Sequence, residues 1–361
     1  MQIFETMAGM GHEQLVMCHD PASGYRGIIA IHSTILGPAL GGTRFWSYGS
    51  DEEAIVDALR LARGMTYKNA VAGLNLGGGK SVIIGDNKTL DRELIFRAHG
   101  RFVESLGGRY ITAEDVGTST ADMDYVHMET KNVSGLAGRS GDPSPVTAHG
   151  VFRAIQASAK EKWGNDDVAN RTVAVQGCGH VGFYLAKELH ESGAKLILTD
   201  IDPDRVKRAA HDFGAVAVGP DEIYGVDADI FAPCALGAII NDKTIPQLSV
   251  EIVAGAANNQ LLEERHGDML EERGILYAPD YVANAGGVIN VYSELAGWTS
   301  ARAFRKADEI YDTVLKVFSI ARQDHVPSYQ AADRLAEQRI RAVGLLVRTW
   351  PQWPNKEGGG H

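Results

Sequence analysis

The chain has few cysteines, no long apolar run and no excess of positive charge, and each shortage excludes a class of protein. Its three cysteines, Cys18, Cys178 and Cys234, are odd in number and far apart, which fits neither a disulfide framework nor a zinc site. No window reaches the roughly 18 apolar residues of a membrane span, and the polar N-terminus is unlike a signal peptide. We therefore expect a cytoplasmic protein with no membrane partner and no metal.

Positive charge is also scarce relative to negative charge. The formal net charge is −11, which argues against nucleic acid as a partner because such a surface needs a cationic face. In hydrophobic and charged content, 44% and 22%, the chain is an ordinary globular protein. At 361 residues it is too long for one small core, so two domains are expected.

The order of patterns along the chain predicts two different α/β halves. In the first half we expect strands at 26–33, 82–84 and 109–113, and helices from Asp51 and over 91–106. A glycine- and proline-rich segment at 138–145 is typical of a hinge. After it, short apolar runs alternate with helical segments, which predicts a parallel, doubly wound sheet. These runs lie at 173–176, 195–199, 229–232, 252–254 and 275–277.

The predicted fold class is therefore α/β with two domains and a cleft between them. Residues 1–134 would form an N-terminal α/β domain, and 331–361 would pack back on it. Residues 135–330 would form a Rossmann-type, doubly wound domain. The last residues, 355–361, have no core-forming side chains and are expected to fray.

A Gly-x-Gly-x-x-Gly motif at 177–182 stands in the context that a dinucleotide site requires. A predicted strand over 172–176 precedes it and a predicted helix over 181–191 follows. The glycines permit a tight turn, close approach of a pyrophosphate and tight helix packing. Asp200 comes 23 positions after Gly177, where a carboxylate would bind ribose hydroxyls and repel a 2′-phosphate. The motif therefore predicts NAD rather than NADP.

Two lysines in the first half are candidates for chemistry. Lys80 follows three glycines at 77–79 in what we expect to be a glycine-rich loop, and Lys68 ends a predicted helix. A lysine pressed into a cleft loses hydration, and its pKa falls, although an isolated lysine is usually a solvated surface charge. A phosphate-binding P-loop is disfavoured because its earlier glycine falls on Leu74 and a strand follows. The lysines and the nucleotide turn together predict an enzyme in which a cofactor meets an anionic substrate.

Seven long stretches of the chain resemble the glutamate/leucine/phenylalanine/valine dehydrogenase family, and its leucine-specific members in particular. The resemblance implies reversible oxidative deamination of an L-amino acid to a 2-oxo acid and ammonia, with NAD as hydride acceptor. The stretches are 37–46, 57–86, 108–118, 142–151, 232–248, 254–261 and 277–291.

The same resemblance implies a catalytic role for three residues. Lys68 would pair with the substrate α-carboxylate, Lys80 would be the general base that activates water, and Asp115 would shuttle the amine proton. A lysine base near neutrality needs a pKa of about 7–8, about three units below its ordinary value. Glu114 is the rival of Asp115, but strand alternation places Ala113 and Asp115 on one face and Glu114 on the other.

The substrate pocket implied by the resemblance is apolar. A buried substrate carboxylate would have no partner in it, which is costly; glutamate enzymes of the family place a lysine where Leu40 stands. Leucine, valine and isoleucine are the expected substrates, with a phenylalanine or valine dehydrogenase as the alternative, because one methylene is worth only about 1–3 kcal/mol. The implied pocket residues are Leu40, Gly41, Gly42, Met65, Ala113, Val288 and Val291.

The resemblance also implies a set of NAD-binding residues and an assembly. Asn258 and Asn284 would bind the nicotinamide ribose or the substrate, although Asn258 also suits a turn, and His180 suits solvent as well as phosphate. A homo-oligomer, commonly an octamer, is implied, with 1–134 as the domain that binds substrate and supports oligomerisation. A non-catalytic sensor would be expected to lack Lys80 or Asp115, and both are present. The cofactor set is Thr147, Gly177, Gly179, His180, Val181, Gly182, Asp200, Ile201, Ala235, Ala256, Asn258 and Asn284.

Overall fold

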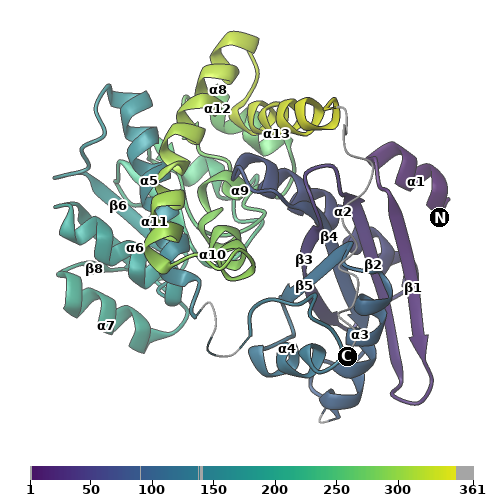
Figure 1. The fold of residues 1–361 in the computed structure, drawn as a ribbon. Coiled ribbons are helices and arrows are strands. Elements are labelled where there is room, and N and C mark those ends of the chain that lie inside the picture. The colour runs from purple at the N-terminus through teal and green to yellow at the C-terminus, as the bar shows by residue number, and fades with distance from the viewer. Residues whose placement is uncertain (1, 90, 137, 139–140, 347–361) are drawn as a thin grey trace.

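The computed structural model describes residues 2–89, 91–136, 138 and 141–346. It contains two separate sheets, each with its own helices (Figure 1). The predicted two-domain α/β fold class is thereby confirmed. The domain boundaries at 134 and 330 stay predictions.

The N-terminal sheet has five strands in the order β1-β2-β4-β3-β5. β3 pairs in parallel with β4 and β5, whereas β1 and β2 run antiparallel at one edge (Figure 1). Successive residues of β2 are buried on opposite faces, one against the apolar face of α2 and one against α3, as a strand covered on both sides requires. The strands are β1 (Gln14–Asp20), β2 (Tyr25–Ser33), β3 (Ala39–Trp46), β4 (Gly77–Ile84) and β5 (Tyr110–Glu114), and the helices are α1 (Ile3–Met10), α2 (Asp51–Val71), α3 (Arg92–Ser105) and α4 (Thr120–His127).

The prediction that Gly77–Gly79 form a loop is wrong, because these residues begin the buried central strand β4. A Cβ atom on Gly78 would collide with the backbone nitrogen of Thr66 in α2, and one on Gly77 would collide with the Ser33 carbonyl. Gly78 therefore lets helix α2 approach the strand closely, and Gly77 does the same for the end of β2. The glycine-rich loop expected at 37–42 is also shorter, since β3 begins at Ala39.

The second sheet is parallel throughout and has six strands in the order β11-β10-β9-β6-β7-β8. Such a sheet, covered by helices on both faces, is of the Rossmann type. The helix expected from Thr147 begins earlier, at Ser144, where Pro145 occupies the first turn without losing a bond. The strands are β6 (Thr172–Gln176), β7 (Lys195–Thr199), β8 (Val216–Ala217), β9 (Ile230–Pro233), β10 (Ile252–Val253) and β11 (Leu276–Tyr277). The helices are α5 (Ser144–Trp163), α6 (His180–Glu191), α7 (Pro203–Phe213), α8 (Arg265–Glu272), α9 (Asp280–Ala283), α10 (Gly286–Leu295), α11 (Ser300–Asp308), α12 (Ile310–Asp324) and α13 (Ser328–Gly344).

Helix α13 returns from the second domain to pack beside α2 (Figure 1). Arg339 donates to the carbonyls at the end of α2 and just beyond it, at 3.1 Å to Ala70 and 2.7 Å to Leu74. Tyr67 donates to Glu337 at 2.7 Å. These contacts are the kind expected of a segment that packs back on the N-terminal domain; the part of that segment over 347–361 lies outside the described residues.

A histidine joins three helices of the second domain and predicts a pH dependence of stability. His149 on α5 contacts Glu188 on α6 and Asp308 on α11, both at 3.0 Å. The hydrogen bond to Glu188, helped by Asp308, raises the pKa of His149. Its stabilising charge is thus fully present below the unfolded pKa of about 6.5 and is lost as pH rises through the higher folded pKa.

We therefore expect the free energy of unfolding to decline as pH rises through this window, and His149→Gln to flatten that decline. Denaturant unfolding at a series of pH values measures the difference. Exposed His211, replaced in the same way, is the matched control. An identical decline in wild type and His149→Gln would contradict the assignment.

Candidate active site

Lys80 is almost completely buried and paired with Asp115. Strand β4 carries Lys80, and Asp115 directly follows β5. Only 5% of Lys80 is exposed, and its Nζ lies 2.7 Å from Asp115 Oδ2. Burial lowers the pKa of Lys80, an effect that Asp115 opposes without reversing it. For Asp115, burial raises the pKa, but Lys80 and Arg44 outweigh it and the net direction is downward. The two side chains therefore form a buried ion pair, in which loss of hydration disfavours the lysine charge, and not a solvated surface salt bridge.

Lys68 projects from α2 toward the second domain. Its Nζ lies 3.3 Å from Asn258 Oδ1, and Asn284 Nδ2 donates to the same oxygen at 2.9 Å. Burial lowers the pKa of Lys68 to about 8, while nearby Asp280 opposes the shift. Three residues that the sequence analysis singled out separately therefore meet across the two domains. The sequence analysis missed Asp280. This residue lies in the stretch 277–291 that resembles the family, but no spacing pointed to it.

Arg44 is a second residue that the sequence analysis missed. Its Nε lies 3.2 Å from Asp115 Oδ2 and its second nitrogen 2.7 Å from Asp57 Oδ2. The alternation of β3 places Arg44 on the same face as Gly42, a predicted pocket residue, and that was the available signal. Asp115 therefore faces two cations, not one.

A cleft of about 700 Å³ opens beside Asp115. Ala113 and Asp115 line it from the N-terminal domain, and Val291 and Asn290 line it from α10 of the second domain. Three other apolar residues of the predicted pocket do not line this cleft: Leu40, Met65 and Val288 belong to one continuous apolar cluster that also includes Val291. Gly41 and Gly42 lie in β3, where added Cβ atoms would strike the backbone at Gly79 and Glu114.

The glycine motif forms the turn between β6 and α6. Gly177 has a φ of 101°, which favours glycine, and a Cβ on Gly182 would collide with the Gly177 carbonyl. At Gly179 a Cβ would meet only Arg205, at 3.7 Å, so the middle of the turn is open to a ligand. A cavity of about 360 Å³ lies here, and Arg205 and Arg208, which the sequence analysis missed, line it with His180.

Asp200 follows β7 and holds the glycine turn. Its Oδ2 accepts from the Cys178 backbone at 2.7 Å and its Oδ1 from the Asp202 backbone at 2.9 Å. Next to it, Ile201 is 88% exposed, and His180 is also exposed. A large apolar side chain left in solvent beside the turn offers a flat contact for a ligand ring.

The remaining predicted cofactor residues gather around the same edge of the sheet. Ala235 follows β9, Ala256 follows β10, and Val181 lies in the first turn of α6. Thr147 lies in the first turn of α5, where its hydroxyl donates to the Pro143 carbonyl at 2.8 Å. Ligands of open parallel sheets bind outside the carboxyl ends of the strands, which is where these positions lie.

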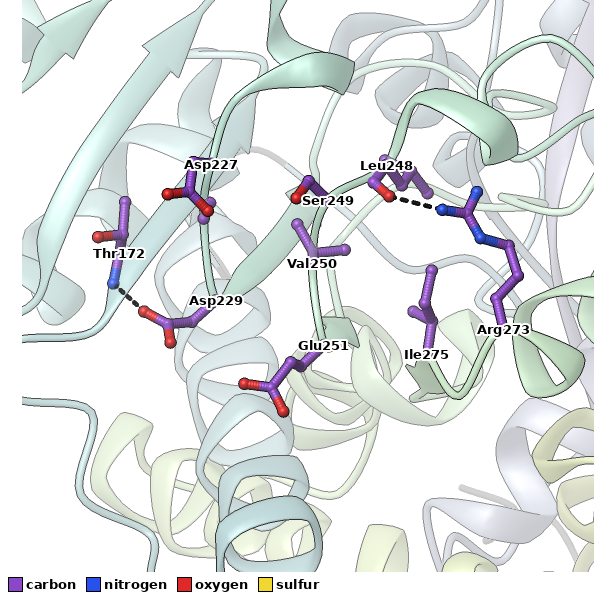
Figure 2. A pocket seen from close by; sticks show the side chains of 10 residues that line it. Thr172, Asp227, Asp229, Leu248, Ser249, Val250, Glu251, Arg273 and Ile275 are labelled. Carbon is purple, nitrogen blue, oxygen red and sulfur yellow. Dashed lines mark hydrogen bonds between the residues drawn. The ribbon is translucent and has the colours of Figure 1, made fainter.

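A different cavity lies at the opposite, amino ends of the strands (Figure 2). It has a volume of about 550 Å³ and includes Thr172, Asp229 and Arg273. Two of its charged groups are already engaged: Asp229 accepts from the Thr172 backbone at 2.7 Å, and Arg273 donates to the Leu248 carbonyl at 3.0 Å. Within the described part of the chain there is no group of three or more residues that could hold a metal ion, and none of its helices is long and apolar enough to cross a membrane.

A Rossmann-type domain facing a cleft with a buried lysine–aspartate pair defines an amino-acid dehydrogenase, and comparison with known proteins agrees. The dimerisation domain of the Glu/Leu/Phe/Val dehydrogenases matches residues 12–132, and the Glutamate/Leucine/Phenylalanine/Valine dehydrogenase domain matches 138–202 and 198–343. The chain belongs to the glutamate/leucine/phenylalanine/valine dehydrogenase family, which confirms the assignment made from the sequence.

Among similar proteins, the leucine dehydrogenase of Thermoactinomyces intermedius is 62% identical over 98% of this chain and 97% of its own length. The leucine dehydrogenase of Bacillus subtilis is 59% identical, with 95% of each chain covered. Among solved structures, L-tryptophan dehydrogenase from Nostoc punctiforme superposes with a TM-score of 0.86 at 48% identity, covering 94% of this chain and 99% of that one.

Proposed function

We propose that this protein catalyses the reversible, NAD-dependent oxidative deamination of L-leucine and other branched-chain L-amino acids to 2-oxo acids and ammonia. The observation that carries the proposal is the buried Lys80–Asp115 pair beside a cleft that both domains line. A buried lysine with a lowered pKa can act as a base near neutral pH. The high identity to leucine dehydrogenases supports the substrate class.

The proposed mechanism gives each polar residue one task. The Lys68 ammonium binds the substrate α-carboxylate, which fixes Cα in the cleft. NAD, when bound, supplies the chemistry by accepting the hydride from Cα, which leaves an iminium carbon on the substrate. Neutral Lys80 takes a proton from the water that attacks this carbon, and Asp115, which contacts Lys80 Nζ, relays that proton to the amine. Lys80 then takes the proton of the new hydroxyl as the carbonyl forms and ammonia departs. Domain closure around the cleft would exclude other water.

NAD is the cofactor that the chain's own residues fit. The open middle of the glycine turn suits a pyrophosphate at the N-terminus of α6. The Asp200 carboxylate is placed to accept from ribose hydroxyls and would repel a 2′-phosphate. Ile201 would contact the adenine ring, and Asn284 would bind the nicotinamide ribose. The full set of site residues given from the sequence is carried forward as part of this proposal.

The substrate preference proposed here follows from the apolar residues that the family resemblance assigns to the side-chain pocket. Leu40, Val288 and Val291 offer no partner to a substrate carboxylate, so glutamate would bury an unpaired charge. Phenylalanine or valine as the preferred substrate is the second candidate, because the similar Nostoc enzyme is named for tryptophan and small pocket changes shift preference by only about 1–3 kcal/mol.

We also propose a cytoplasmic homo-oligomer, an octamer by analogy with the family, with residues 1–134 contributing to assembly. The matching family domain is named as a dimerisation domain. Light scattering on the purified protein would measure the subunit number, and a monomer would contradict this part of the proposal.

The activity is tested by following NADH formation at alkaline pH with leucine, valine, isoleucine, phenylalanine and glutamate. We expect turnover with the three branched-chain substrates and none with glutamate, and little or no activity when NADP replaces NAD. A phenylalanine rate well above the leucine rate would move the protein to the second candidate. Silence with all five, despite measurable NAD binding, would favour a non-catalytic sensor.

A further inference from the structure

The guanidinium of Arg44 lies between two carboxylates. Its Nε is 3.2 Å from Asp115 Oδ2, and its terminal nitrogen is 2.7 Å from Asp57 Oδ2. The Asp115 oxygen that it contacts is the one that Lys80 Nζ contacts at 2.7 Å. Arginine carries a permanent charge on a rigid planar fork. The fork therefore fixes both the position and the charge environment of one carboxylate oxygen in the site.

Asp57 holds this guanidinium from the other side. It lies on α2, the helix that carries Lys68, and its Oδ2 also accepts from the Tyr48 hydroxyl at 2.8 Å. The side chains of Arg44 and Asp57 are only 21% and 15% exposed. Exposed Arg60 touches the outer oxygen of Asp57 at 3.2 Å. A connected set of polar contacts therefore runs from α2 through β3 to Asp115.

We propose that Arg44, held by Asp57, is a positioning residue for the dehydrogenase reaction: it orients Asp115 and shares its negative charge, so that Lys80 is never locked in an exclusive ion pair. The inference rests on the proposed function in one respect, the role of Lys80 as the base. It concerns residues that act through Lys80 and Asp115 and do not touch the substrate themselves.

The charges around Lys80 predict the direction in which each substitution should shift its pKa. Burial is the largest cause of the lowered pKa of Lys80; Asp115 opposes it, Arg44 adds to it, and Asp57 opposes it. The other charged groups nearby are Lys68 on α2 and Glu114, the exposed neighbour of Asp115. Arg44 and Asp57 therefore act on Lys80 in opposite directions.

This opposition makes the test specific. Arg44→Gln removes the cation that competes for Asp115, so the acid limb of the pH profile of kcat/KM should move to higher pH, by several tenths of a unit to about one unit. Asp57→Asn leaves Arg44 to Asp115 alone, so the same limb should move to lower pH. A nonspecific structural disturbance of the site would not shift the pH profiles of Arg44→Gln and Asp57→Asn in opposite directions.

Two further variants separate charge from geometry. Arg44→Lys keeps the charge but loses the fork, so we expect a fall in kcat with the limb close to that of wild type. Arg26→Gln is the matched control: Arg26 also joins the sheet to α2, through Asp51 at 2.7 Å, but both side chains are more than half exposed and neither contacts Asp115. Its profile should match that of wild type.

The measurement is kcat/KM for L-leucine and NAD over a range of pH, with thermal unfolding of each variant to establish that it is folded. Titration of the substrate is common to all variants and cancels in the comparison. If the acid limbs of Arg44→Gln and Asp57→Asn move in the same direction, or if neither moves, the inference is overturned and the proposed function is left intact.

An inactive wild type would instead count against the proposed function. The inference is then tested by competitive acetylation of Lys80 with acetic anhydride at a series of pH values, read by mass spectrometry. The expected order of Lys80 pKa is Arg44→Gln highest, wild type between, and Asp57→Asn lowest. Any other order would overturn it.

Discussion

Lys80→Ala should reduce turnover of L-leucine by about 10³-fold while NAD still binds. The reduction is of the size expected when a general base is removed. Lys80 is buried beside the cleft and its pKa is lowered by burial, whereas the glycine turn lies in the other domain. Steady-state rates of NADH formation measure turnover, and quenching of protein fluorescence on titration with NAD measures binding.

The matched control is Lys88→Ala, because Lys88 is an exposed lysine shortly after the same strand. Its turnover should stay within about twofold of wild type, as surface substitutions usually do little. A tenth or more of wild-type activity in Lys80→Ala would mean that another group is the base. Loss of NAD binding in that variant would contradict the division of tasks between the two domains.

Gly78→Ala should destabilise the protein by about 1–3 kcal/mol, the usual effect of overpacking a core. The new methyl group would collide with the backbone nitrogen and hydroxyl of Thr66, and backbone cannot move aside as a flexible side chain can. Helix α2 would have to shift away from β4. Because α2 carries Lys68 and β4 carries Lys80, kcat/KM should fall in the same variant. Denaturant unfolding and steady-state kinetics measure the two effects.

Gly64→Ala is the control for this substitution. Gly64 lies in the same helix, but a Cβ there has nothing within 4 Å, so alanine should stabilise the helix by roughly 0.5–1 kcal/mol. Opposite signs for the two variants are expected. A destabilisation by Gly64→Ala as large as that by Gly78→Ala would show that α2 tolerates no alanine at all, and that close packing on β4 is not the reason for the glycines.

The parts of the fold that were predicted correctly are those with a local pattern. Strand β6 matched its predicted range 172–176, and β7 matched its range 195–199. Both are short apolar runs between helical segments, which is a pattern visible in the local sequence. The three glycines at 77–79 were misplaced in a loop because glycine has no side chain from which a period can be read. Each of them meets a different neighbour: Gly77 the end of β2, Gly78 helix α2 and Gly79 the ring of Tyr110. Only the fold brings these neighbours together.

The residues missed in the site share a physical cause. Arg44 and Asp115 are 71 positions apart, so no spacing rule connects them. An arginine on a strand reads as a solvated charge until the helix that covers it is placed. Asp57 likewise reads as an ordinary polar position of an amphipathic helix.

The sequence by itself determined the family, the two-domain α/β class and the position of the nucleotide turn. These depend on the order of residue types over short stretches of the chain, which can be read directly from the sequence. Only the tertiary structure decided that Asp115 is shared between Lys80 and Arg44 and that Lys68 meets Asn258 across the cleft. Burial and charge pairing depend on distance in space, and folding alone sets that distance.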